Sequence, residues 1–107
     1  MKARKSWLAF GKRISGDLVV DGGCVRALRS GSSLLAAGIR QSAGDYAPGD
    51  TVRVLTEDYQ EIARGVVNFR HEDIELIKGM KTDEFRKLLP SNDRDEVIHR
   101  NNMVLMI

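Results

Sequence analysis

Glycine and proline divide this chain into short segments, and this division limits what it can fold into. Gly31 follows an apolar helix face of about two turns, and Pro90 ends another short one. The turn signal at 47–50 has Pro and Gly at its two central positions, where a tight turn prefers them. Short β-branched runs lie between these points. We therefore predict a mainly β fold with short helices (α+β), in the form of a small barrel or curled sheet.

Residue patterns place the individual elements. β-Branched or alternating runs predict strands over 17–21, 51–55, 61–69, 97–100 and 103–107, and a further strand at the end of the small-residue segment 31–39. Helices are predicted from residue 22 to Gly31, over 71–78, and over 82–89 with Thr82 as N-cap. Gly65 lies inside a predicted strand, which indicates a bulge, a bend or the close approach of another backbone.

The first helix has a defined start and one apolar face. The Asp21 carboxylate stands where it can accept a hydrogen bond from the backbone N–H of Cys24. Cys24, Ala27 and Leu28 have the spacing of a single helix face. We expect Cys24 to be buried against the other two.

Composition and length indicate one globular domain of 107 residues, 42% of them hydrophobic and 30% charged. No apolar run approaches the roughly 18 residues that span a bilayer, so no membrane association is expected. The basic start is followed only by the short apolar cluster 7–10, too short for a secretory signal. A single cysteine permits no internal disulfide and fits a reducing, cytoplasmic setting.

Charge is distributed unevenly along the chain. Residues 1–40 carry eight Lys and Arg against two Asp, and the other 67 carry nine basic against 13 acidic side chains. This asymmetry is compatible with an anionic partner for one face, and equally with an uneven solvated surface.

No catalytic or metal site is predicted. Gly31-Ser32-Ser33 lacks the spacing and the lysine of a phosphate-cradling loop. His71 and His99 are 28 residues apart, and neither has a second ligand at helical spacing. Cys24 has no neighbouring His or Lys to lower the pKa of its thiol, so we interpret it as structural.

Recognition of a phosphate is the remaining hypothesis. Arg26, Arg29 and Arg40 flank the segment 31–39, whose glycines and serines leave backbone N–H groups uncluttered. Guanidinium groups and backbone donors are the groups that bind phosphate. The alternative is that Gly31 only ends a helix and Gly38 only forms a turn.

Several short motifs occur together in a characteristic order. They are Val20–Cys24, Ala27-Leu28, Gly31–Leu35, Gly38-Ile39, Gly49-Asp50, Ile62–Gly65 and Val97–Arg100. In this combination, over residues 14–105, the chain resembles the PUA domain family, and most closely the PUA domains of the glutamate 5-kinase family. The resemblance implies a pseudo-barrel of mixed strands over 14–107, with 1–13 as the linker out of a kinase domain.

The family also implies a candidate binding face. In RNA-modifying relatives the first helix, the loop after it and a late strand contact RNA. Carried over by position, the RNA- or phosphate-binding candidates are Arg26, Arg29, Gly31, Ser32, Ser33, Arg40, His99 and Arg100.

Two functions follow from the resemblance. The first is an accessory, regulatory or structural domain of an enzyme that uses ATP and Mg to phosphorylate the glutamate γ-carboxylate in proline biosynthesis. Its partner would be the kinase domain of the same polypeptide; this chain alone would be no enzyme and would hold no cofactor. The second is an RNA-binding module. A homo-oligomer is compatible with both.

Overall fold

The structure, a computed structural model, describes residues 13–107, so most of the expected linker 1–13, with the cluster 7–10, lies outside the described residues. The strands are β1 (Ile14–Val20), β2 (Leu34–Leu35), β3 (Ile39–Gly44), β4 (Thr51–Leu55), β5 (Glu61–Val66), β6 (Glu96–Ile98) and β7 (Met103–Leu105). The helices are α2 (Gly22–Arg29), α3 (His71–Ile77) and α4 (Thr82–Leu88), with 3₁₀ turns η1 (Ala36–Gly38) and η2 (Arg100–Asn102). This is the α+β composition predicted from the sequence.

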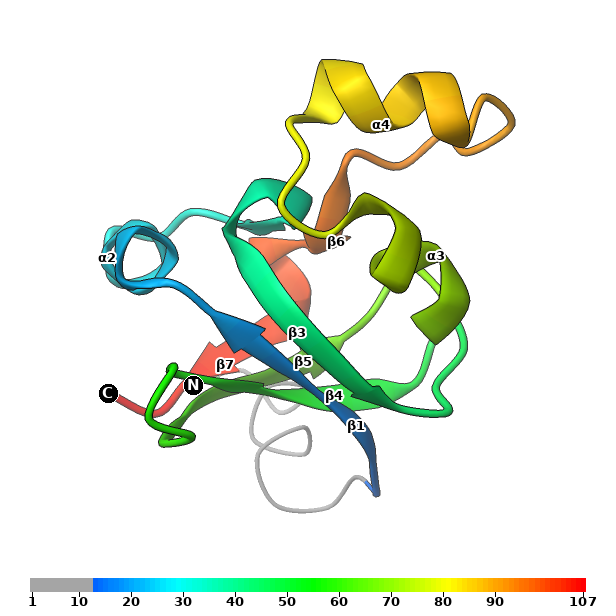
Figure 1. Ribbon diagram of the computed structural model, residues 1–107. Coiled ribbons are helices and arrows are strands. Elements are labelled where there is room, and N and C mark those ends of the chain that lie inside the picture. Colours follow the sequence, from blue (N-terminus) through cyan, green and yellow to red (C-terminus); the bar gives the residue numbers. More distant parts are fainter. Residues whose placement is uncertain (1–12) are drawn as a thin grey trace.

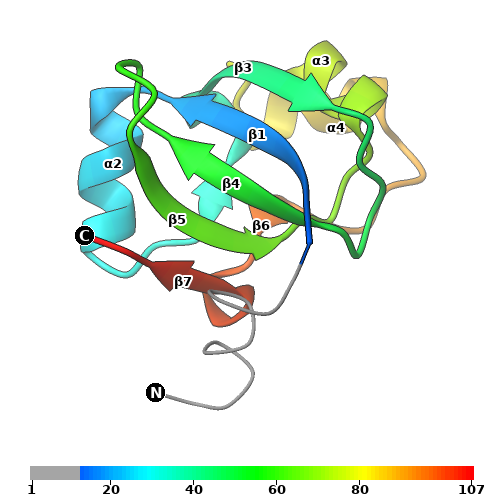
Figure 2. The ribbon, with the colours of Figure 1, turned by 90° about the horizontal axis from the view of Figure 1, so that it is seen from below.

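Five strands form one curled mixed sheet in the order β3-β1-β4-β5-β7 (Figures 1 and 2). β1 pairs in parallel with β4, and the other pairs are antiparallel. β2 and β6 form a separate two-stranded sheet. The Asp17 carboxylate and the Arg53 guanidinium join β1 to β4 through two hydrogen bonds of 2.7 and 3.0 Å. The result is the predicted pseudo-barrel of mixed strands.

The core lies between the curled sheet and the elements that cover it. Leu18, Val54 and Ile62 point inward from three neighbouring strands, each at most 2% exposed. α4 contributes Phe85, whose ring meets that of Phe69 edge-on with centroids 5.9 Å apart. Full burial of side chains of this size contributes about 1.5–3 kcal/mol each.

Gly65 fixes how the end of the chain crosses the sheet. A Cβ atom at this position would lie 2.6 Å from Ile98 Cγ2 and 2.9 Å from the carbonyl oxygen of Asn102. β6 and η2 therefore pack directly on the backbone of β5, so that of the three alternatives left open by the sequence the close approach of another backbone is the one observed. This crossing sets the position of Arg100 in η2.

Some element boundaries differ from the prediction. Thr82 is not the N-cap of α4 but its first residue, after Lys81, whose backbone N–H donates to Glu84 Oε1 at 3.2 Å. β5 ends at Val66 because its partner β4 begins opposite, at Thr51. The N–H of Val67 instead donates to the carbonyl of Asp50 at 3.0 Å, in the turn 47–50. Among residues 13–107, no helix is long and apolar enough to cross a membrane.

Candidate functional site

The loop after α2 is held by the end of that helix. The N–H of Gly31 donates to the carbonyl of Leu28 at 3.0 Å, and the N–H of Ser32 to that of Ala27 at 3.1 Å. With Gly31 at φ 92°, these two bonds form a Schellman motif. Both N–H groups are therefore used inside the protein, so these two of the uncluttered donors expected in the segment 31–39 are not available to a phosphate.

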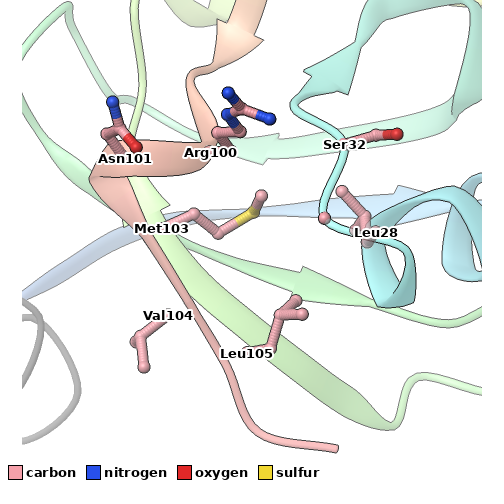
Figure 3. Close-up of a pocket in the computed structure, with 8 residues that line it drawn as sticks. Leu28, Ser32, Arg100, Asn101, Met103, Val104 and Leu105 are labelled. Carbon is pink, nitrogen blue, oxygen red and sulfur yellow. The ribbon is translucent and has the colours of Figure 1, made fainter. Parts of the chain in front are cut away.

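The loop and η2 meet at one groove. The backbone N–H of Arg100 donates to Ser33 Oγ at 2.9 Å, which joins segments that are 67 residues apart in the sequence. Beside this bond lies a groove of about 300 Å³, which we call the edge groove, lined by Leu28, Gly31, Ser32, Arg100, Met103 and Leu105, among others. In Figure 3, Met103 points from β7 toward Leu28 of α2, and Arg100 lies near Ser32.

The edge groove has an apolar floor and a polar rim. Leu28 is 1% and Met103 4% exposed, whereas Ser32, Arg100 and Asn101 are exposed. Within the described part of the chain, no acid lines this groove and no ion pair involves Arg100. Arg100 therefore presents a positive charge beside a hydrophobic surface.

Arg26 and Arg29 lie in a different hollow of about 330 Å³, which we call the mixed-charge hollow. Thr56, Glu57 and Asp58, from the loop after β4, line it together with the two arginines. The two carboxylates offset the positive charge that the sequence suggested for this face.

Arg40 and His99 are also engaged within the protein. Arg40 Nη2 lies 3.7 Å from Asp21 Oδ2. His99 Nδ1 accepts a hydrogen bond from the N–H of Asn101 at 3.0 Å. Of the eight candidates, the structure brings Gly31, Ser32, Ser33 and Arg100 together, with His99 adjacent in sequence, and places Arg26, Arg29 and Arg40 elsewhere.

Cys24 is less buried than predicted. Its N–H donates to Asp21 Oδ1 at 2.7 Å, as expected, but the residue is half-buried and Ala27 is exposed. Cys24 packs against Gly38, because a Cβ atom added at Gly38 would lie only 2.8 Å from Cys24 Sγ. Ala27 turns away from the core. Burial, and secondarily the Asp21 charge, raise the pKa of the thiol to about 12, which disfavours the nucleophilic thiolate.

Sequence reasoning missed a polar network between β3 and α3. Ser42 Oγ lies 2.6 Å from Tyr46 Oη and 2.8 Å from His71 Nδ1. Burial raises the pKa of Tyr46 to about 12. The network fastens α3 to the sheet, and only the fold brings its members together, since Ser42 and His71 are 29 residues apart. The described residues contain no group of three or more His, Cys, Asp or Glu that could hold a metal ion.

Comparison with known proteins identifies the fold. The model of the PUA domain family matches residues 16–89. The chain belongs to the PUA domain family. A PUA domain structure from Aeropyrum pernix superposes with a TM-score of 0.61 at 25% identity, over 88% of this chain and 46% of that one. An archaeal box H/ACA sRNP protein superposes with a TM-score of 0.54 at 20% identity, over 56% of this chain and 19% of that one. This likeness concerns the fold alone.

The sequence of this PUA domain is also similar to part of an enzyme. It is 44% identical, over 99% of its length, to glutamate 5-kinase from a Thermoanaerobacter species. The chain spans 29% of that enzyme's length.

Proposed function

We propose that this PUA domain is the accessory domain of a glutamate 5-kinase and acts through contacts with the kinase domain of the same polypeptide. The observation that carries this proposal is the 44% identity over 99% of the chain, which extends well beyond the matched PUA region 16–89. ATP, Mg and glutamate would bind in the kinase domain, and the reaction would be the phosphorylation of the glutamate γ-carboxylate in proline biosynthesis. The setting would be cytoplasmic.

The described residues support an accessory role. Phosphoryl transfer needs backbone that cradles phosphates, a cation that pairs with them, and carboxylates that hold Mg²⁺. The loop 31–33 uses its first two N–H groups internally, and no acid lines the edge groove in the described part of the chain. The domain would therefore support or tune the enzyme without chemistry of its own.

A chimera tests this proposal. The corresponding PUA region of the Thermoanaerobacter glutamate 5-kinase would be replaced by residues 14–107 of this chain, and glutamate-dependent ATP consumption measured. We expect the chimera to consume ATP at a rate close to that of the parent, and the isolated chain to unfold cooperatively without turnover. A matched chimera carrying the 25% identical PUA domain from Aeropyrum pernix should consume ATP more slowly. Equal behaviour of the two chimeras, or turnover by the isolated chain, would contradict the proposal.

RNA binding is the second candidate, favoured by the meeting of Gly31, Ser32 and Arg100 at one groove, with the hydrogen bond from Arg100 to Ser33 beside it. The acids beside Arg26, Arg29 and Arg40 weaken it, because affinity for RNA depends on several uncompensated cations facing one backbone. Titration with an RNA hairpin at 50 and 200 mM salt tests it. RNA binding predicts an affinity that falls steeply with salt and is weaker in Arg100→Gln than in Arg40→Gln; salt-independent binding contradicts it.

A further inference from the structure

The outer edge of β7 has hydrogen-bonding groups that face away from the sheet. β7 is the last strand of the five-stranded sheet, and no other described strand pairs with it beyond β5. The N–H of Met106 donates to the carbonyl of Ile62 at 2.8 Å, and Val104 lies opposite Arg64. Because backbone groups alternate in direction along an antiparallel strand, those of Met103 and Leu105 point away from β5.

This free edge coincides with the edge groove. Met103 and Leu105, whose backbone groups are turned outward, both line the groove, and Leu28 of α2 lies across from Met103 in its floor (Figure 3). Leu105, Met106 and Ile107 are 36%, 38% and 46% exposed. Edge strands of natural proteins are usually protected by charged residues, proline or a covering element. Residues 103–107 contain neither a charged side chain nor a proline.

We propose that the free edge of β7 binds an extended peptide segment of a partner protein, which adds a strand to the sheet and places a carboxylate on Arg100. Strand addition gives affinity through main-chain hydrogen bonds and specificity through pockets for alternate side chains. The groove volume of about 300 Å³ accommodates apolar side chains of such a strand over Leu28 and Met103. The inference does not depend on the identity of the parent enzyme.

Charge decides which occupant fits. Arg100 has no ion-pair partner among residues 13–107, so an acidic side chain of the peptide would complement it. A second copy that paired through the same edge would bring residues 99–107, which contain no Asp or Glu and repeat Arg100, against this face. RNA would meet one cation, an apolar floor and no aromatic side chain for base stacking among the groove residues.

The probe is a blocked heptapeptide of alternating valine and threonine with one central glutamate. It would be added free, and also fused after Ile107 through a flexible eight-residue Gly/Ser linker, which raises its effective concentration to the millimolar range. Amide chemical shifts and hydrogen exchange of Met103 and Leu105 would be followed by NMR. We expect the tethered peptide to protect the Leu105 amide, and a version with central lysine to protect it roughly three- to tenfold less.

Two variants separate main-chain from side-chain contributions. Leu105→Pro removes an N–H that β5 does not use, so it should abolish peptide binding while the β5–β7 pairing remains. The matched variant Leu105→Ala keeps that N–H and should retain binding, with lower affinity. Arg100→Gln should remove the preference for glutamate over lysine.

Several outcomes would overturn the proposal. The proposal is wrong if the tethered glutamate peptide does not protect the Leu105 amide from hydrogen exchange, or if the glutamate and lysine peptides protect it equally. It is also wrong if Leu105→Pro binds the peptide as well as the parent does. Chemical-shift changes at Arg100 and Ser32 that an RNA hairpin causes and the peptides do not cause would assign the groove to RNA. Protection of Leu105 that rises with protein concentration in the absence of peptide would assign the edge to a second copy.

Discussion

The edge groove and the mixed-charge hollow are both built on α2, yet they differ in how their charges are balanced. In the mixed-charge hollow, Arg26 and Arg29 share a concave surface with Glu57 and Asp58. In the edge groove, Arg100 stands beside buried Leu28 and Met103 without an acid among the described lining residues. A count of basic residues would favour the first site, whereas a recognition surface requires an uncompensated charge next to apolar area. This difference directs attention to Arg100.

The thiol of Cys24 reports whether α2 is held firmly between these two sites, and it gives the largest expected effect. A pKa near 12 in place of 9.0 leaves about a thousandfold less thiolate at pH 8, and the greater nucleophilicity of a more basic thiolate offsets part of this. We expect labelling by a thiol reagent in the native protein to be roughly 30- to 100-fold slower than in urea. Equal rates would show that α2 opens readily.

Gly65→Val should destabilise the domain more than any of the substitutions that follow. The new side chain would collide with Ile98 and with the carbonyl of Asn102, which costs about 2–3 kcal/mol of unfolding free energy. Denaturant unfolding measures the loss, and NMR shifts should concentrate at the edge groove and spare the mixed-charge hollow. Gly23→Ala, where a Cβ meets only ordinary contacts of 3.5 Å or more, is the control and should change stability little.

Asp21→Ala removes the side-chain cap of α2, so the N–H of Cys24 loses its acceptor. We expect this to lower the free energy of unfolding, measured in denaturant, by about 1 kcal/mol. Asp21→Asn keeps a capping oxygen and should retain most of the stability. Since the Asp21 charge contributes to the raised thiol pKa, both variants should label Cys24 faster than the parent. A stable alanine variant with unchanged labelling would contradict this account of the helix start.

Ser33→Ala should lower the free energy of unfolding by about 0.5–1 kcal/mol, because the N–H of Arg100 loses the acceptor that lies 2.9 Å away. Ser32→Ala is a matched control from the same loop, because the Ser32 hydroxyl makes no hydrogen bond across the groove to another residue of 13–107. Thermal unfolding of the two variants makes the comparison. Equal stability of the two would mean that this bond does not hold the loop to η2.

Arg40→Gln gives the smallest expected effect, a loss of less than about 0.5 kcal/mol in the free energy of unfolding. Its ion pair with Asp21 is at the surface, with a distance of 3.7 Å, and such pairs contribute little. A loss above about 1 kcal/mol in denaturant unfolding would show that this pair anchors α2 to β3.

Local signals explain what the sequence predicted correctly. The Asp21 cap, the turn 47–50 and the crowded position of Gly65 each depend on residues close together or on the absence of a side chain. The PUA motifs then linked these pieces into the correct fold. Thr82 was misassigned because Glu84 satisfies the N–H of Lys81 without a hydroxyl cap.

The candidate site was predicted less well because its geometry depends on distant segments. The sequence grouped Arg26, Arg29 and Arg40 by proximity along the chain, but in the structure each has acidic neighbours: Glu57 and Asp58 share the hollow of the first two, and Asp21 pairs with Arg40. The free edge of β7 follows from its register against β5, and the link between Ser33 and Arg100 spans 67 residues. No local pattern records these long-range pairings.

The parallel pairing of β1 with β4 has a consequence for the order of folding. β1 is an interior strand of the sheet, but one neighbour, β3, begins at Ile39 and the other, β4, at Thr51. A growing chain therefore makes β1 before either neighbour and leaves both edges of that strand without these partners until the later segments emerge. Closing the loop of roughly 30 residues between β1 and β4 costs entropy before any pairing is gained, which slows folding relative to hairpin formation. During that interval Leu18, Val19 and Val20, buried in the finished domain, are open to contact with other chains.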